Sequence, residues 1–476
     1  MNIQGLDIPG LRILNWSLAP HQHWGIFVTQ SSVSKPLEQL FHRHYSEITE
    51  LPATIGFVSL SEQQKLHEDE ITKDETDFNN FIDYGSTVEE LIKDVGCDDD
   101  KAEELLERLN LTGLKQRGFR QLSTGETRRV MLARAMASEP DMLFLEEPYA
   151  GLDVENRALL KQVLDQLASV CQLVVLASRV EEMPSCLTHI ALFDGKSLSQ
   201  TMTTEEWQTN PVVRQLNALS EQKSEQYVRL INQYGDQPEL PSPLLNMNNA
   251  KVEYTDGLIF GNLNWTVKEG QHWQIRGPNG CGKSSLLGLI TGDHPQCYSN
   301  DIQVLGYQRG GGESIWDVKK KIGIVSSSLH LQYRVGCSAL DVLLSGFFDS
   351  IGLYESPSAN QVNIANQWLA VLGMTDYKKD SFTSLEYGQQ RLLLIARALI
   401  KRPALLILDE PYQGLDYLSR QLIMKVVDKV AQFNLSHLLY VTHHKEDQLS
   451  SICHYVDFIP NNGPGFTPVI HHGVES

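Results

Sequence analysis

A glycine-rich loop that ends in lysine and serine could bind the phosphates of a nucleotide. Residues 277–284 read Gly-Pro-Asn-Gly-Cys-Gly-Lys-Ser and match the pattern G-x-x-x-x-G-K-[ST]. We predict an apolar strand before the loop, at 272–275, and a helix that opens after it, at 285–290. Backbone N–H groups of such a loop turn toward phosphate oxygens, and the helix start adds partial positive charge. We therefore predict that Lys283 reaches the β- and γ-phosphates of ATP and that the Ser284 hydroxyl binds Mg²⁺. The residues predicted to contact ATP here are Gly277, Asn279, Gly280, Cys281, Gly282, Lys283, Ser284 and Ser285.

Two carboxylates follow a run of aliphatic residues further along the chain. Residues 405–410 read Leu-Leu-Ile-Leu-Asp-Glu, which is typical of a buried strand that ends in acidic side chains. Asp409 would hold the metal, directly or through water, and Glu410 would polarise the attacking water. His443 follows the next apolar segment, where it could touch the γ-phosphate, and His444 is the weaker candidate for this role.

Two further residues close to the loop are candidates for the same site. Tyr254 lies upstream of the loop and is suitably placed to stack on adenine; otherwise it is an ordinary strand aromatic. Cys281 lies inside the loop and either fills space or presents a thiol whose modification blocks ATP. In the second case a maleimide would inactivate the protein, and ATP would slow the reaction.

The chain repeats itself, which places these residues in two related domains. Gly125 stands 22 residues before Glu147, and Gly388 stands 22 residues before Glu410, within two closely similar segments. Such self-similarity indicates a tandem duplication. Strands alternate with helices in each copy, and this predicts an α/β fold with a mostly parallel sheet.

The predicted organisation is two domains joined by a linker. A degenerate domain spans residues 1–203, and a domain with the intact loop spans 244–476. Between them, residues 204–243 form a polar, helix-like linker that ends in Gly-Asp-Gln-Pro-Glu-Leu-Pro-Ser-Pro.

The combined motifs resemble those of ABC ATPases over both halves of the chain. They are the phosphate loop, Leu-Ser-Thr-Gly-Glu at 122–126, Leu-Asp-Glu-Pro at 408–411 and the strand-end histidine. More narrowly, residues 291–302, 314–334 and 346–354 are similar to those of ModF-type twin ATPases, labelled as molybdenum-transport ATP-binding or photorepair proteins. The resemblance implies tandem P-loop NTPase domains, each with a mostly parallel sheet core, an antiparallel β part and a helical subdomain. It also implies head-to-tail pairing, with each ATP between the loop of one domain and the signature motif of the other.

The first copy departs from the family pattern at its phosphate loop. Residues 29–36 read Thr-Gln-Ser-Ser-Val-Ser-Lys-Pro and contain no glycine. Side chains at those positions resist the backbone turn, and Pro36 removes both the metal-binding hydroxyl and an N–H group. Glu146 stands in place of Asp409, and Ser178 in place of His443.

The second copy departs at its signature motif instead. Glu386 stands where the family has serine, whereas Ser123 of the first copy is retained and pairs with Glu126 in a capping-box pattern. A carboxylate about 4 Å from a γ-phosphate costs on the order of 4 kcal/mol for each charge pair at an effective dielectric constant near 20.

Head-to-tail pairing collects these defects on one composite site and leaves the other intact. We predict a single hydrolytic site, with Glu410, His443 and Lys283 as its catalytic residues and Ser284 and Asp409 on Mg²⁺. Its ATP-binding set is Tyr254, the loop residues named above and, from the other domain, Ser123, Gly125 and Asp153. The second site would bind nucleotide weakly or not at all.

The composition of the chain limits where the protein is expected in the cell and what it is expected to bind. The net charge of −19 weighs against non-specific nucleic-acid binding, and no apolar run reaches the length that spans a bilayer. We expect a cytoplasmic protein without direct membrane insertion, either free or peripheral on the inner face of the cell membrane. The seven cysteines form no C-x-x-C pair, so zinc and iron–sulfur sites are not expected.

The sequence is compatible with three cellular roles. The chain could energise an importer, for molybdate by its family label, by docking on transmembrane permease subunits. It could instead be a soluble ATPase that acts on a macromolecule, or a regulator with slow turnover. Ser327 stands where the family usually has the glutamine that senses the permease, and this departure counts against ordinary transport coupling.

Overall fold

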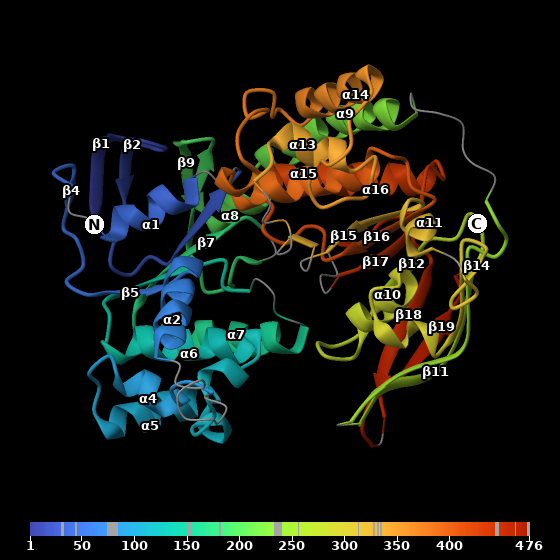
Figure 1. Ribbon diagram of the computed structural model, residues 1–476. Coiled ribbons are helices and arrows are strands. Elements are labelled where there is room, and N and C mark those ends of the chain that lie inside the picture. The colour runs from blue at the N-terminus through green and yellow to red at the C-terminus, as the bar shows by residue number, and fades with distance from the viewer. Residues whose placement is uncertain are drawn as a thin grey trace. The chain divides into compact units, whose positions relative to one another are not determined.

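The computed structural model describes the chain as two compact units, Met1–Val213 and Arg214–Ser476 (Figure 1). We refer to them as unit 1 and unit 2. The description covers all residues except 30–32, 43–44, 74–83, 150–151, 153, 180–181, 233–239, 256, 313, 327–328, 331–332, 334–335, 443–446, 462 and 474–476.

The described residues of unit 1 form a nine-stranded mixed sheet in the order β4-β1-β2-β9-β8-β3-β7-β6-β5. Strands β8, β3, β7, β6 and β5 run parallel to one another, and β1 and β2 form an antiparallel hairpin. The strands are β1 (Asn2–Ile8), β2 (Leu11–Ser17), β3 (Trp24–Val28), β4 (Ile48–Thr49), β5 (Ile55–Val58), β6 (Met142–Glu146), β7 (Gln172–Ala177), β8 (His189–Asp194) and β9 (Ser197–Thr203). The helices are α1 (Ser34–His42), α2 (Leu60–Thr72), α4 (Val88–Lys93), α5 (Asp99–Arg108), α6 (Thr124–Ala137), α7 (Val154–Leu167) and α8 (Thr204–Thr209).

Unit 2 repeats this arrangement with one more strand among its described residues. Its sheet has the order β14-β13-β10-β11-β19-β18-β12-β17-β16-β15. The strands are β10 (Leu245–Tyr254), β11 (Gly257–Val267), β12 (Trp273–Arg276), β13 (Asp301–Val304), β14 (Tyr307–Gln308), β15 (Ile322–Val325), β16 (Leu405–Asp409), β17 (His437–Val441), β18 (His454–Pro460) and β19 (Phe466–His471). The helices are α10 (Lys283–Thr291), the 3₁₀ helix η5 (Pro295–Tyr298), α11 (Ile315–Lys319), α13 (Ala339–Ser345), α14 (Ala359–Val371), α15 (Tyr387–Leu399) and α16 (Tyr417–Gln432).

Equivalent aromatic pairs show how closely the two units correspond. Trp16 and Trp24 meet edge to face with ring centroids 5.7 Å apart, and Trp265 and Trp273 do so at 5.5 Å. The second tryptophan of each pair also stacks on a histidine of the neighbouring strand, at 4.9 Å in both units. The duplication and the predicted fold class are confirmed.

In unit 2 a helical part packs above the parallel strands (Figure 1), and α13 contacts both α14 and α15. Its core contains Trp368 of α14, Leu393 of α15 and Val427 of α16. A second core, around Trp265 and Trp273, lies under the β10–β11 hairpin and α10. Alternate residues of β16 and β17 belong to these two cores, so both faces of these strands are packed and the loops at their ends have a firm base.

The segment predicted as a linker contains two packed helices. In α8, Trp207 is buried and its ring lies 5.1 Å from that of Phe27 in unit 1. Helix α9 (Val212–Asn232) packs into the helical core of unit 2, where Tyr227 meets Trp368 edge to face. Glu221 of α9 also pairs with two lysines of α16. Each end of this segment is therefore anchored in its own unit.

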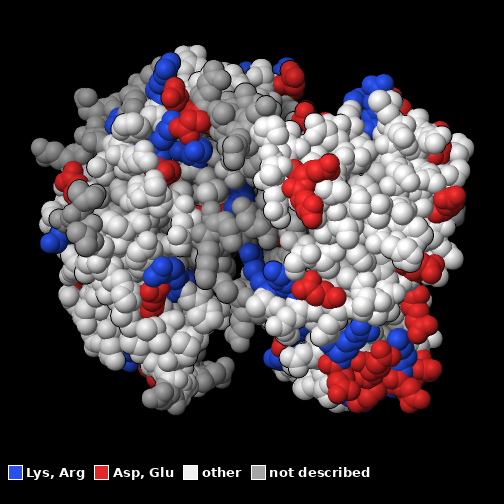
Figure 2. Space-filling view, turned by 180° about the vertical axis from the view of Figure 1, so that it is seen from behind, with Lys and Arg blue, Asp and Glu red and all other residues white. Residues whose placement is uncertain are grey.

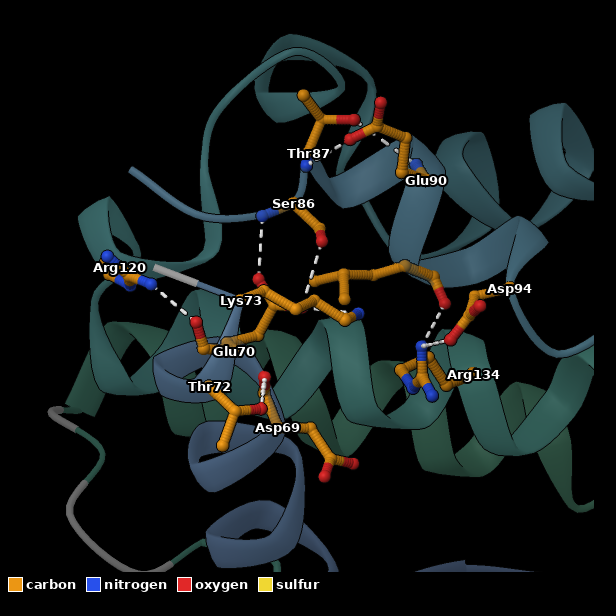
Figure 3. A network of polar contacts seen from close by, with 11 residues as sticks. Asp69, Glu70, Thr72, Lys73, Ser86, Thr87, Glu90, Asp94, Arg120 and Arg134 are labelled. Atoms are coloured by element: carbon orange, nitrogen blue, oxygen red, sulfur yellow. Dashed lines mark hydrogen bonds and ion pairs between the residues drawn. The ribbon is translucent and has the colours of Figure 1, made fainter. Parts of the chain in front are cut away.

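A buried carboxylate organises the helical part of unit 1 (Figure 3). Glu70, at the end of α2, accepts hydrogen bonds from the N–H and hydroxyl of Ser86 at 2.7 and 2.9 Å and from Lys73 at 3.1 Å. Burial opposes ionisation, but these bonds and the charge of Lys73 outweigh it and lower the pKa of Glu70. Arg120 donates to the backbone carbonyl of the same residue. The network fixes α2 against the chain that enters α4.

Between α2 and α6, unit 1 contains an insert, residues 73–123, with an acidic, solvent-exposed surface that basic side chains partly neutralise. Acidic and basic side chains gather at the lower right of Figure 2, over α4 and α5. Lys93 pairs with Glu89 and Asp99, and Lys115 pairs with Glu103. The exposed acids here are Glu90, Asp94, Asp98, Asp99, Asp100, Glu103, Glu104 and Glu107. Part of the insert, residues 74–83, lies outside the described chain.

Candidate nucleotide-binding site

The loop between β12 and α10 has the conformation that only glycine permits. Gly277 has φ 153° and Gly282 has φ 99°, in the region that residues with a side chain rarely adopt. A Cβ atom at Gly282 would stand 2.8 Å from atoms of Ile259 and Phe260. The glycines therefore allow both the turn and the close approach of the loop to β11, as the motif predicts.

Lys283, the first residue of α10, is folded back into this loop. Its Nζ donates to the carbonyl oxygens of Gly277 and Pro278 at 2.9 and 2.7 Å, and the residue is only 8% exposed. The ammonium group thus lies inside the loop that is expected to surround the phosphates. This placement suits a lysine that neutralises phosphate charge.

Ser284 and Asp409 form the oxygen pair expected of a magnesium site. The Ser284 hydroxyl donates to Asp409 Oδ2 at 3.3 Å, although the two residues are far apart in sequence. Burial raises the pKa of Asp409 above its ordinary value. The Ser284 hydrogen bond and the charges of Lys283 and Arg391 oppose this shift only in part. Hydroxyl and carboxylate oxygens are hard ligands of the kind Mg²⁺ takes alongside water and substrate phosphates. These residues therefore fit the cation that the family implies.

Glu410 follows on a strained turn that a buried arginine supports. Its φ is 48°, and its backbone N–H donates to Val441 at the end of β17. The fully buried Arg391 of α15 donates to the carbonyl oxygens of Asp409 at 3.1 Å and Glu410 at 2.6 Å, and also to Ser326 at 3.1 Å. Arg391 is not among the residues predicted from the sequence. The repeat could have identified it, because Arg128 stands at the matching position of unit 1.

One cavity collects most of the predicted residues of unit 2. It has a volume of about 390 Å³, and both carboxylates, the lysine and the tyrosine face it. Its lining is Tyr254, Ile259, Asn279, Gly280, Gly282, Lys283, Ser284, Ser285, Asp409 and Glu410. Gly277 and Cys281 belong to the loop but do not line the cavity. His443, His444, Ser327 and Asp153 lie outside the described residues.

Cys281 is a packing residue in the described structure. It is fully buried, with Sγ 3.8 Å from Lys283 Nζ. Burial raises the pKa of the thiol despite the nearby ammonium charge. A buried thiol with a raised pKa is a poor nucleophile.

The signature of unit 1 has the predicted helix cap. Ser123 caps α6, since its hydroxyl accepts the Glu126 N–H at 3.4 Å and the Glu126 carboxylate accepts the Ser123 N–H at 2.7 Å. A Cβ atom at Gly125 would meet Asn156 at 2.9 Å, so that position needs glycine. In unit 2, Glu386 caps α15 and donates its N–H to Gln389 at 3.1 Å. The exposed Glu386 thus places a carboxylate where unit 1 has the Ser123 hydroxyl.

Comparison with known proteins agrees with this geometry. A family model described as ABC transporter matches residues 31–150 and 260–413, more than half of the chain. The chain belongs to the ABC transporter family of ATPases. It is 44% identical to the ABC transporter ATP-binding protein ModF of Escherichia coli (strain K12) over 428 residues, which cover 88% of this chain and 85% of that protein. The chain is therefore a ModF-type ABC ATPase with two ATPase domains in tandem.

Two more distant relatives bear on fold and function. The molybdate import ATP-binding protein MolC of Haemophilus influenzae (strain ATCC 51907 / DSM 11121 / KW20 / Rd) is 31% identical over 42% of this chain and 72% of that protein. The solved structure of an RNase-L inhibitor has a TM-score of 0.63 and covers 99% of this chain and 90% of that one. Its sequence identity is 16%, so that likeness concerns the fold alone. No helix in the described part of this ABC ATPase is long and apolar enough to cross a membrane.

Proposed function

We propose that this twin ABC ATPase hydrolyses ATP at one site, with the loop of unit 2 and the signature of unit 1 closing on the same nucleotide. The reciprocal site, with the loop of unit 1 and the Glu386 signature, binds nucleotide weakly or not at all. The observation that carries the proposal is the 390 Å³ cavity, where a phosphate loop, a metal-binding oxygen pair and Glu410 come together. Pairing of the two units over ATP is inferred from the family resemblance.

In this proposal each residue around the cavity has one task. Tyr254 stacks on adenine, the loop amides and Lys283 bind the phosphates, and Glu410 orients the attacking water and accepts its proton. Mg²⁺, when bound by Ser284 and Asp409, neutralises charge on the phosphates. His443 supplies a donor to the γ-phosphate.

The test compares two matched carboxylates. Glu410→Gln removes the proton acceptor at nearly constant shape, so phosphate release should fall by roughly a hundredfold or more. Glu147→Gln, the same change in unit 1, should alter turnover less than about threefold. Phosphate release at saturating ATP measures both variants. Equal losses in the two variants would disprove the single-site assignment.

For the cellular role, we propose that the chain energises an importer of the molybdate type. The likeness to ModF over most of both chains and to a molybdate import ATP-binding protein over part of this one supports the role. The partners would be transmembrane permease subunits. The Glu410→Gln variant, held with ATP and used as bait in detergent extracts, should capture a membrane protein pair.

One sequence feature favours a second candidate, a soluble ATPase that acts on a macromolecule or as a regulator. Ser327 replaces the glutamine that couples family members to permeases. If the same bait recovers ribosomes or another soluble assembly and no membrane protein, this second role replaces the first. Restoring glutamine at position 327 should then leave capture unchanged.

A further inference from the structure

The segment 291–302 has no role in the site described so far. It runs from the end of α10 through η5 to β13 and borders the last residues of β10. Strand β10 pairs with β13 only over Leu245–Asn248. Beyond that point, side chains of the segment take over the hydrogen bonding of the strand edge.

Two amide side chains replace the missing partner strand. Asn300 accepts the N–H of Lys251 at 2.8 Å and donates to its carbonyl oxygen at 3.0 Å. Gln296 does the same for Glu253, at 3.1 and 2.6 Å. A primary amide carries both a donor and an acceptor, so each side chain satisfies one whole backbone residue. The end of β10 is thereby held in place up to Tyr254.

His294 continues this series to the tyrosine side chain. Its Nε2 lies 2.8 Å from Tyr254 Oη, and its Nδ1 accepts the backbone N–H of Gln296 at 3.2 Å. Burial lowers the pKa of His294, which favours the neutral ring. With Nδ1 acting as acceptor, the single ring hydrogen belongs on Nε2 and is donated to the phenol oxygen. The phenolic hydrogen of Tyr254 is then free to be donated elsewhere.

The same histidine is anchored to the helix that carries the phosphate-binding lysine. Its backbone N–H donates to Gly288 in α10 at 3.1 Å. A Cβ atom at Gly288 would lie 3.1 Å from that of His294, so the helix and the histidine are in close contact. Asp293, the preceding residue, accepts from Thr291 at 2.7 Å and from Lys319 at 2.5 Å. His294 thus connects α10 to the ring of Tyr254.

The two units differ both in the residue at the position of Tyr254 and in the length of the segment that contacts it. At the end of β1, before the equivalent hairpin, Ile8 occupies the place of Tyr254. The connection from α1 to β4 has five residues, 43–47, whereas the one from α10 to β13 has nine, 292–300. The aromatic ring and the segment that contacts it therefore occur together, in the unit with the intact phosphate loop.

We propose that His294, Gln296 and Asn300 form a clamp that positions Tyr254 against adenine and fixes this ring relative to α10 and its phosphate-binding end. His294 is a positioning residue, since it acts through Tyr254. The inference rests on the proposed ATP site of unit 2. It goes beyond that site because it assigns base recognition to a segment outside the nucleotide cavity.

The decisive experiment separates the base from the phosphates. Binding of ATP and of inorganic tripolyphosphate is measured by calorimetry for the full chain carrying Glu410→Gln, with and without His294→Ala. The clamp predicts that His294→Ala weakens ATP binding by about fivefold to tenfold and leaves tripolyphosphate binding unchanged. Equal weakening of both ligands would show that His294 only supports the phosphate loop, and would overturn the proposal.

A double-mutant cycle tests whether the histidine acts through the tyrosine. Tyr254→Phe keeps the ring and loses the oxygen, so it should weaken ATP binding as much as His294→Ala, and the double variant should be no weaker. Fully additive losses would overturn the clamp. The control is Gln308→Ala, which removes an exposed amide that bonds Asp301 instead of β10, and it should bind both ligands normally.

Further variants allow for the case that His294→Ala does not fold. The Glu410→Gln chain with an intact clamp distinguishes failure of the clamp from failure of the ATP site. If His294→Ala does not fold, His294→Gln, which retains a donor, should restore near-normal ATP binding, while Tyr254→Phe and Asn300→Ala should not. Normal ATP binding in these two variants would reject the clamp. If the Glu410→Gln chain with an intact clamp binds neither ATP nor tripolyphosphate, the ATP site itself is wrong, and the clamp fails with it.

Discussion

The two phosphate-loop lysines of this chain have opposite surroundings. Lys283 is buried and bonded to two carbonyl oxygens of its loop. Lys35 is exposed on α1 and is followed by Pro36, where unit 2 has Ser284. In unit 1, Thr29 bonds Asp194 and Gly195 in place of a glycine turn. A lysine alone does not make a phosphate site, because the glycines must first turn the chain back over it.

The turn that follows the acidic strand survives in both units, by contrast. Glu147 and Glu410 have φ values of 43° and 48°, and each donates its N–H to the neighbouring strand, at Leu176 and Val441. The Glu147 side chain, however, accepts the Ser178 N–H at 2.7 Å. Burial, reinforced by the charge of Glu182, raises the pKa of Glu147 to about 8. A raised pKa favours the protonated carboxyl group, which is a poor proton acceptor, and this supports the proposal that hydrolysis depends on Glu410 and not on Glu147.

Exchanging the signature defect between the units should have the largest effect. Ser123→Glu would place a carboxylate near the γ-phosphate of the proposed working site, at a cost on the order of 4 kcal/mol, or about a thousandfold in kcat/KM. The reverse change, Glu386→Ser, should alter kcat/KM little, because the loop of unit 1 remains defective. Steady-state phosphate release measures both variants. Activity retained in Ser123→Glu would show that this signature does not face the working loop.

Acid should weaken unit 2 through a buried histidine. His272 accepts the Leu438 N–H and contacts Asn434, and burial, with the nearby His437, lowers its pKa from 6.5 to about 4. Between these values the unfolded chain binds a proton that the folded unit does not. The free energy of unfolding should therefore fall as the pH drops from about 6.5 to about 4, by about 3 kcal/mol in total, and this contribution should change no further below pH 4.

Urea unfolding at pH 7 and pH 4.5 measures this loss, and His272→Gln should flatten the pH dependence. His23 makes the equivalent bond to Leu173 in unit 1, and burial lowers its pKa in the same direction. A pH profile of unfolding that is identical in the wild type and in His272→Gln would contradict the assignment.

The two loop lysines should differ by a smaller but clear factor. Lys283→Ala removes charge-assisted hydrogen bonds to phosphate, each worth about 1.5–3 kcal/mol, so ATP affinity should fall by roughly a hundredfold. Lys35→Ala should leave the affinity within about twofold, since that side chain is exposed and lies outside a glycine loop. Titration with a fluorescent ATP analogue compares them. A similar loss in both variants would mean that unit 1 also binds nucleotide.

The smallest expected effect concerns the thiol in the loop. Because Cys281 is buried, a maleimide should modify it more slowly than Cys337 and Cys453, which are partly exposed. Mass spectrometry of peptides after brief labelling gives the relative rates. Labelling of Cys281 first, with protection by ATP, would instead support an accessible reactive thiol.

Local motifs made much of the site predictable. The turn of residues 277–284, the capping box of Ser123 and the strand before Asp409 each depend on neighbours within a few positions. The repeat then located the equivalent places in the other unit. Packing of α9 was harder to predict, because its apolar residues, such as Tyr227 and Ile231, cover one face of an otherwise polar helix.

The amino-acid order alone therefore specifies the duplication, the phosphate loop and the type of chemistry, since each depends on residue types at short, regular spacing. Contacts between distant segments decided what those residues do. Arg391 holds the turn at Asp409, burial and the charge of Glu182 raise the pKa of Glu147, and His294 reaches Tyr254 from forty positions away. Such contacts form only when strands and helices pack, because burial and hydrogen bonding across the fold set both the pKa values and the positions of the side chains.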